Sequence, residues 1–225
     1  MCGRVALHDD KQFLEEVKKT IKQVQHNLTL QPSYNIAPSQ TIATLTNDRI
    51  YQYTRFGLIP HWAKNTKFQP INARAETLTE KPTFRTPFKS KRCIIPVNGF
   101  YEWKKEGGHK IPYWIYPTKG NYFALAGIYD TWTNPETNEK ITSSAIITTS
   151  PNDIMKPIHD RMPVILEPED WAIWLDKGIK ESEALTPLLQ PFSDSSMDAY
   201  EVSTFVNTPA NNTEKCITPM KSQLF

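Results

Sequence analysis

Short runs of apolar and β-branched residues, separated by proline-containing segments, recur along most of the chain. Runs of this kind with turn residues between them are typical of β-strands. We expect strands within 41–46, 92–103, 122–130, 144–150, 162–166 and 200–206. The chain holds 18 prolines against only 8 glycines, which favours many rigid turns between the strands.

A helical period of apolar residues is clear in two segments only. In the first, 9–25, Asp9 or Asp10 stands where it can cap the helix. Its apolar stripe consists of Phe13, Val17, Ile21 and Val24. The second, 167–178, has a proline near its start, acidic residues in its first turn and Gly178 at its end.

The order of these elements indicates the fold class. Strands dominate and helices interrupt them irregularly, without the alternation that a parallel βαβ sheet requires. We predict an α+β protein, a single domain with a mixed or antiparallel, barrel-like β core flanked by helices. The domain is expected to cover 2–225, with Met1 removed and 207–225 forming a tail that wraps the surface.

Composition narrows the class of protein. Of 225 residues, 39% are hydrophobic, which is ordinary for a protein with a globular core. The net charge is only +2, so any anion-binding surface must come from a local cluster of basic residues. The three cysteines are an odd number without CxxC spacing, which argues against a disulfide framework or a zinc site. Four histidines lack metal-ligand spacing: His8, His26, His61 and His109. No run is long and apolar enough for a bilayer span, so we expect a cytoplasmic protein without metal or cofactor.

Three residues carry chemistry that an ordinary strand protein would not need in these places. Cys2 follows the initiator methionine, and Glu102 lies between Tyr101 and Trp103 at the end of an apolar run. A carboxylate in that setting is partly desolvated, which raises its pKa towards use as a general acid or base. His159 stands beside a predicted strand. Taken one at a time, each also fits a purely structural role, as a buried thiol, a solvent contact or a satisfied imidazole.

Six motifs, taken together, indicate a family. They occur in the order MCGR, YNIAPSQ, GLIPHWAK, INARAET, CIIPVNGFYEW and PIHDRMPVIL. The chain resembles the SOS-response-associated peptidase (SRAP) family, whose members crosslink to abasic sites in single-stranded DNA. The resemblance is dense from Cys2 to about Leu166 and looser beyond. Two positions depart from the pattern: Phe56 replaces a common tryptophan, and His61 replaces a small polar residue. Both keep or add a flat ring beside a loop expected to face DNA.

The resemblance implies a covalent reaction at the chain terminus. With Met1 removed, the α-amine of Cys2 would attack the aldehyde of an open abasic sugar, and its thiol would close a thiazolidine ring. Glu102 matches the proton shuttle of the family. His159 matches the histidine that helps to open the sugar and takes part in reversal. Asn72 matches the asparagine that positions the abasic site.

The resemblance also implies DNA contacts. Arg4, Arg74 and Arg161 are expected to bind phosphates that flank the reacting nucleotide. Pro38, Trp62 and Trp103 are expected to offer surfaces on which bases stack. The implied partner is single-stranded DNA with abasic sites. We expect a monomer that joins the nucleoid when bound to DNA, and no membrane partner.

Two other functions remain open at this point. One is a thiol peptidase or autopeptidase, in which Cys2 is the nucleophile and His159 the base. The other is a non-catalytic module for single-stranded DNA in which Cys2 is merely buried. The crosslinker needs a free Cys2 amine, the peptidase needs mainly the thiol, and the binding module needs neither.

Overall fold

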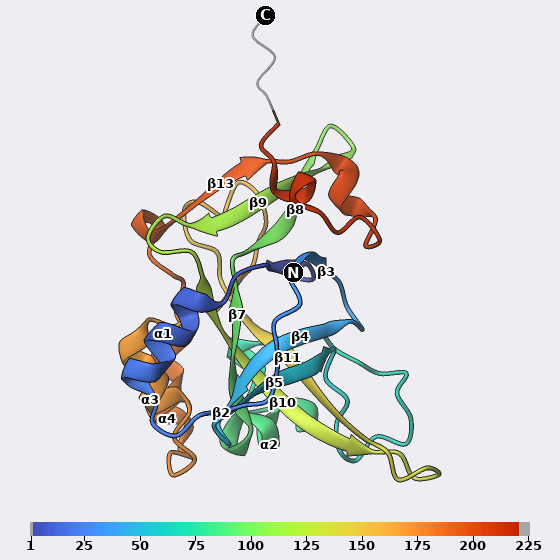
Figure 1. Ribbon diagram of the computed structural model, residues 1–225, viewed down its shortest axis with the longest axis vertical. Helices are drawn as coiled ribbons and strands as arrows, with labels where there is room; N and C mark the ends of the chain where they lie inside the picture. The colour runs from blue at the N-terminus through green and yellow to red at the C-terminus, as the bar shows by residue number, and fades with distance from the viewer. Residues whose placement is uncertain (1, 221–225) are drawn as a thin grey trace, which may run out of the picture.

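A five-stranded β-barrel forms the centre of the computed structural model, which describes residues 2–220 (Figure 1). Neighbouring barrel strands are antiparallel, except that β11 pairs with β5 in parallel and so closes the barrel at Ser143–Arg55 and Ser144–Phe56. The barrel strands are β4 (Thr41–Thr46), β5 (Ile50–Phe56), β7 (Arg92–Val97), β10 (Phe123–Thr133) and β11 (Lys140–Thr149). The predicted single-domain α+β fold with a mixed, barrel-like core is confirmed. Met1 and the last five residues of the predicted tail, 221–225, lie outside the described residues.

Three short strands extend the barrel sheet. The strand β2 (Gln25–His26) pairs with β5, and both β6 (Asn72–Arg74) and β12 (Met162–Pro163) pair with β11. The predicted strand at 162–166 is therefore limited to two residues. The run at 144–150 forms the second half of β11, a longer strand that starts at Lys140.

A second sheet lies above the barrel in Figure 1 and carries five strands in the order β13-β9-β8-β1-β3. They are β1 (Val5–Leu7), β3 (Ser33–Ile36), β8 (Gly99–Glu106), β9 (His109–Pro117) and β13 (Met197–Glu201). The run 200–206, predicted as one strand, ends its strand at Glu201 and continues as a 3-10 turn, Thr204–Asn207.

The chain passes from the barrel to this second sheet at Asn98. The run 92–103, predicted as one strand, is therefore two strands in two sheets, β7 and β8. A β-carbon on Gly99 would lie 2.4 Å from the Trp114 ring and from the Ile115 carbonyl, so only glycine fits this crossing. The Asn98 side chain pairs with backbone groups that lie beside this crossing. Its Nδ2 donates to Asp9 O and Asn121 O, and its Oδ1 accepts from the His8 N–H.

The helices are shorter than the sequence pattern predicts. The helix α1 (Lys11–Thr20) ends before Ile21, whose backbone is extended, because the chain turns to pair β2 with β5. Asp9, not Asp10, accepts from the first helical N–H, and Asp10 instead accepts from the Tyr51 hydroxyl. The segment 167–178 gives a 3-10 turn and one short helix, α3. The remaining helical elements are α2 (Pro82–Ser90), η1 (Ala75–Thr77), η2 (Pro168–Asp170), α3 (Trp171–Trp174), α4 (Ser182–Leu185), η3 (Thr186–Leu188), η4 (Asp194–Ser196), η5 (Thr204–Asn207) and η6 (Glu214–Ile217).

The helices α1, α3 and α4 lie on one side of the barrel, at the left in Figure 1. Arg92 on β7 is fully buried and donates to five backbone carbonyls, among them Phe88 O at the end of α2 and Trp174 O at the end of α3. This guanidinium holds the ends of α2 and α3 against the barrel strand β7. No helix within residues 2–220 is long and apolar enough to cross a membrane.

Candidate active site

Cys2 lies just ahead of β1, where two strands fix the start of the chain. The strand β1 pairs with β3 on one side and with β8 on the other, in the register Val5–Phe100. The Tyr101 N–H donates to Arg4 O at 2.9 Å, which continues that register towards the terminus. One further step brings Glu102 level with Gly3, next to Cys2. Cys2 itself is fully buried.

Asn72 holds Cys2 from the barrel side. It begins β6, which pairs in parallel with β11 at Ile146. Its Nδ2 donates to Cys2 O at 3.0 Å, and the distance from Nδ2 to Ile146 O is 3.5 Å. Its Oδ1 is buried and accepts no hydrogen bond from residues 2–220, which leaves an acceptor available to a substrate.

Glu102 and His159 face each other beside Cys2. The distance from His159 Nε2 to Glu102 Oε2 is 3.8 Å. Glu102 is 2% exposed, and this burial raises the pKa of its carboxyl, while the nearby His159 acts in the opposite direction. A buried carboxyl with a raised pKa is suited to donate a proton as well as to accept one.

The His159 ring is held by its own turn. The backbone N–H of His159 donates to Met155 O, and the Arg161 N–H donates to His159 Nδ1 at 3.1 Å. This contact favours the tautomer with its proton on Nε2, the nitrogen that faces Glu102. Asp160 Oδ1 lies 2.8 Å from Nδ1, but it belongs to an exposed side chain and competes for Nδ1 only when the ring is protonated there.

The thiol of Cys2 is held in its neutral form. Burial raises its pKa well above the usual value, and the charge of Glu102 raises it further. A cysteine that acts as the primary nucleophile needs the opposite, a cation or helix N-terminus that lowers its pKa. The surroundings of Cys2 therefore do not activate its sulfur as the first attacking group.

A cleft of about 370 Å³ opens beside Glu102 and His159, and neither Cys2 nor Asn72 belongs to its lining. It is lined by Glu102, Trp103, Lys105, Lys110, His159 and Asn207. The predicted residues Glu102, Trp103 and His159 thus share one cavity. Lys105, Lys110 and Asn207 were not among the predicted site residues, although the Gly-Gly pair at 107–108 signals the hairpin that carries the two lysines.

Arg4 is engaged within the protein. Its Nη1 donates to Asn35 Oδ1 and to Val206 O, both at 2.7 Å, and its guanidinium lies over the Trp103 ring, 5.6 Å from the centroid. Trp103 in turn donates from Nε1 to Asn207 Oδ1 at 2.8 Å. That Arg4 binds a phosphate and that Trp103 stacks on a base stay predictions. Each contact with DNA would have to form while these internal bonds are kept.

Asn35, in the YNIAPSQ motif, connects this corner to the end of the chain. Its buried Nδ2 donates to Val206 O, Thr208 O and Asn211 O, while its Oδ1 accepts from Arg4. These bonds hold 206–211 against β3. Since Asn207 lines the cleft, one wall of the cleft depends on Asn35.

The other two predicted arginines lie near β11. Arg161 makes a bidentate ion pair with Glu76, at 2.6 and 2.9 Å, and also donates to Thr148 O. This hydrogen bonding lowers the pKa of the Glu76 carboxyl. Glu76 belongs to η1, which follows the strand β6 that carries Asn72 and Arg74. Arg74 is exposed.

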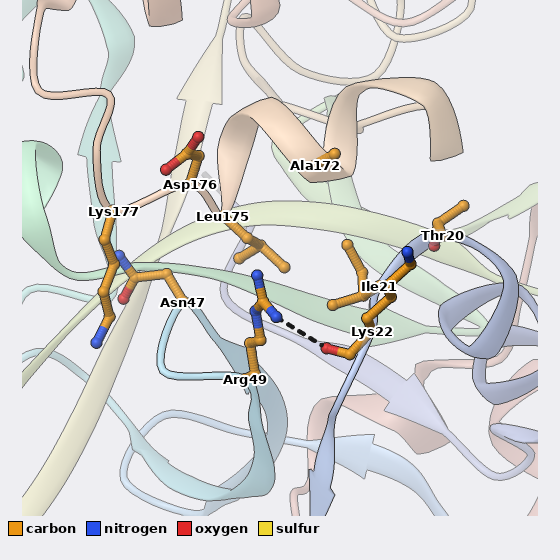
Figure 2. A pocket seen from close by; sticks show the side chains of 9 residues that line it. All are labelled: Thr20, Ile21, Lys22, Asn47, Arg49, Ala172, Leu175, Asp176 and Lys177. Atoms are coloured by element: carbon orange, nitrogen blue, oxygen red, sulfur yellow. Dashed lines mark hydrogen bonds between the residues drawn. The ribbon is translucent and has the colours of Figure 1, made fainter.

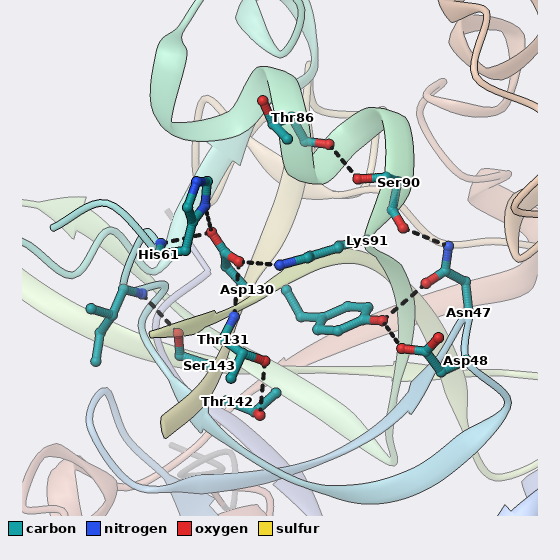
Figure 3. Close-up of polar contacts among 12 residues, drawn as sticks. Asn47, Asp48, His61, Thr86, Ser90, Lys91, Asp130, Thr131, Thr142 and Ser143 are labelled. Atoms are coloured by element: carbon teal, nitrogen blue, oxygen red, sulfur yellow. Dashed lines mark hydrogen bonds and ion pairs between the residues drawn. The ribbon is translucent and has the colours of Figure 1, made fainter. Parts of the chain in front are cut away.

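Trp62 and Pro38 are exposed and do not belong to the lining of the cleft. The exposed fraction of Trp62 is 55%. Its loop is tied to the barrel on both sides, at His61 (Figure 3) and at Ala63. The buried Asp130 accepts from the His61 N–H at 2.8 Å, and its carboxylate contacts His61 Nδ1 at 2.9 Å and Lys91 Nζ at 2.5 Å. Trp132 donates to Ala63 O. His61 therefore serves as an anchor of the loop.

Phe56, the other departure from the family pattern, is fully buried in the barrel. The expectation that both departures place a ring beside a DNA-facing loop is therefore wrong for Phe56. Because Phe56 pairs with Ser144 where β5 meets β11, its ring belongs to the closure of the barrel.

A second hollow, of about 470 Å³, lies between the end of α1, the β4–β5 turn and α3 (Figure 2). Two of its basic side chains are already engaged, since Arg49 donates to Lys22 O and Lys177 pairs with Asp48. Within residues 2–220 no cluster of three or more histidine, cysteine or acidic side chains is arranged to hold a metal ion.

The chain is similar to known proteins over most of its length. Abasic site processing protein YoqW of Bacillus subtilis is 47% identical over 224 residues, which cover 96% of this chain and 99% of that protein. Abasic site processing protein HMCES of Xenopus tropicalis is 31% identical, over 83% of this chain and 66% of that protein. A crystal structure of a Bacteroides thetaiotaomicron protein superposes with a TM-score of 0.87 at 31% identity, covering 97% of this chain and all of that one. Residues 1–209 match the SOS response associated peptidase (SRAP) family, and the chain belongs to that family.

Proposed function

We propose that this protein senses abasic sites in single-stranded DNA and attaches to them covalently through the α-amine and thiol of Cys2. The observation that carries the proposal is a terminal cysteine held between Asn72 and a buried Glu102, which itself faces His159 at 3.8 Å. The relatives YoqW and HMCES are named abasic site processing proteins, and these names support DNA with abasic sites as the substrate.

The proposed reaction uses both nucleophiles of one residue. With Met1 removed, the α-amine of Cys2 attacks C1′ of the open sugar, and the aldehyde oxygen leaves as water after proton transfer. The resulting imine then accepts the thiol: sulfur bonds to C1′, and the thiol proton passes to nitrogen. The product is a five-membered thiazolidine and one water.

Glu102 and His159 would move the protons. Burial raises the pKa of the Glu102 carboxyl, which favours its use as a proton donor to the departing oxygen, and the carboxylate that results can take a proton from the amine. His159 Nε2 faces Glu102 and can return the proton. The free Oδ1 of Asn72 is available to accept from the amine or from the sugar hydroxyl.

The raised pKa of the Cys2 thiol supports the amine as first nucleophile. A peptidase would need the thiolate, which this burial disfavours, so we do not propose the peptidase as the main activity. A non-catalytic binding module would give no reason to bury Glu102 beside Cys2, since an ionisable group in that position costs stability.

The test is a time course with a single-stranded oligonucleotide that carries one abasic site. The mature protein should give a complex that resists heat and denaturant, and intact mass should show that Met1 is absent. Fully duplex abasic DNA at the same salt should react more slowly. A variant with residues added ahead of Cys2 should give no thiazolidine; an unchanged rate in that variant would contradict the proposal.

A further inference from the structure

The hairpin that joins β8 to β9 projects two lysines beside the candidate active site. Gly107 and Gly108 have φ of +55° and +80°, which is the backbone of a tight two-residue hairpin turn. This turn fixes the register of the strands. Lys105 consequently lies directly opposite Lys110.

Two like charges in this arrangement are unfavourable by themselves. Side chains of directly opposed residues share one face of a sheet, and like charges there destabilise the pair. Within residues 2–220 no acidic side chain forms an ion pair with either lysine. On the opposite face of the same strand, Lys104 pairs with Glu106 at 3.0 Å. Both Lys105 and Lys110 are exposed, and both line the cleft that holds Glu102 and His159.

We propose that Lys105 and Lys110 form a phosphate-binding site for the DNA strand that enters the cleft. The inference rests on the proposed function and adds to it two contacts outside the predicted arginines. Phosphate between the two ammonium groups converts their repulsion into two attractions.

The neighbouring residues fit a nucleotide. Trp103 lies opposite Pro112 on the face that Lys105 and Lys110 share. Residues two apart along a strand are separated by about 7 Å. A base that stacks on Trp103 therefore leaves its backbone phosphate within reach of the Lys105 and Lys110 side chains. Contacts of this kind fix the position of the strand without reading its sequence.

The experiment measures equilibrium binding without crosslinking. The probe is a fluorescent single-stranded oligonucleotide with one tetrahydrofuran residue, which lacks the aldehyde, titrated by anisotropy at several salt concentrations. For the double variant Lys105→Gln, Lys110→Gln we expect affinity to fall about three- to tenfold at low salt. The slope of log K against log salt should become shallower by about 0.7 for each phosphate that the variant no longer neutralises.

Lys104→Gln is the matched control, because it removes the same charge from the other face of the same strand. Its salt slope should equal that of the parent. The double variant should also melt at an equal or slightly higher temperature, by up to about 2 °C, since it removes a repulsion. Weaker binding together with undiminished thermal stability excludes a merely structural role.

A salt slope in the double variant equal to that of the parent would overturn the inference, as would an equal loss of affinity in Lys104→Gln. The parent protein is assayed in parallel on an oligonucleotide with a true abasic site. Absence of a covalent complex there would refute the proposed function, whereas binding to the tetrahydrofuran probe reports on the lysines independently of Cys2.

Discussion

Replacing Glu102 by glutamine should make the protein more stable and less active at once. The carboxyl lies 2% exposed between Cys2 and His159, and burial raises its pKa. A raised carboxyl pKa means that the fold favours the neutral form. The neutral carboxyl therefore contributes to the stability of the fold. This contribution is fully present at acid pH and is lost as pH rises through the raised pKa of Glu102. Glutamine resembles the neutral form at every pH, so it should remove that loss.

The size of the effect depends on two opposing contributions. At 3.8 Å, two unit charges attract by about 4 kcal/mol at an effective dielectric constant of 20, but only while His159 is protonated. Burying the charged Glu102 carboxylate away from water costs on the order of several kcal/mol. We expect a net gain of about 1 to 2 kcal/mol above neutral pH, which corresponds to about 2 to 8 °C in Tm for a chain of this length.

The assay is thermal unfolding of parent and Glu102→Gln from pH 4 to pH 8. The difference in Tm should be near zero at the acid end and should grow with pH. Crosslinking should slow by about a hundred- to ten-thousandfold, because proton transfer is impaired. Glu106→Gln is the control, since it removes an exposed carboxylate from the same strand, where an ion pair contributes little. A variant less stable than the parent at pH 8 would refute the reasoning, since the charged carboxylate would then stabilise the fold.

Three further predictions follow from single contacts. Cys2→Ala keeps the α-amine but lacks the thiol, so on denaturing gels it should give no heat-stable adduct while strand cleavage remains; a normal adduct would refute the thiazolidine. Asn72→Ala leaves the Cys2 carbonyl without its donor, so it should lower stability by about 1 to 3 kcal/mol in denaturant unfolding and slow crosslinking; unchanged stability would contradict this. Asp130→Asn should loosen the loop of Trp62 and weaken single-strand binding about two- to tenfold. That loss of affinity should vanish in a Trp62→Ala background, and equal losses in both backgrounds would show that the loop does not act through Trp62.

Much of the strand content could be predicted from the sequence because apolar runs and turn residues are local signals. The Gly-Gly pair at 107–108 is another local signal, for a hairpin that was not among the predicted elements. The grouping of Cys2, Glu102 and His159 could be predicted only because the motifs occur together. No local pattern brings residues so distant in the chain to one place.

Local signals failed where long-range contacts decide the structure. The stripe that predicts a helix to residue 25 continues past Thr20, but pairing of β2 with β5 ends the helix there. Within the run 92–103, the strongest turn signal is Asn98–Gly99. The division of this run into two strands depends on the Trp114 ring, which packs on Gly99 and lies outside the run. Likewise, the pairing of Arg161 with Glu76 spans 85 residues, so the sequence does not show that this predicted phosphate ligand already has a carboxylate partner.

A site built on the first residues of a chain must overcome the tendency of termini to fray. Here the terminus is held by three separate parts of the fold: β1 pairs on both sides, Asn72 binds the Cys2 carbonyl, and Arg4 bonds to Asn35. Each contact joins residues that are far apart in the chain, so each depends on the tertiary fold. The loss of chain entropy in ordering the terminus therefore occurs during folding and not when DNA binds. In the proposed reaction, the α-amine and the thiol of Cys2 would already lie in fixed positions beside Glu102, and a flexible terminal cysteine would lack this preorganisation.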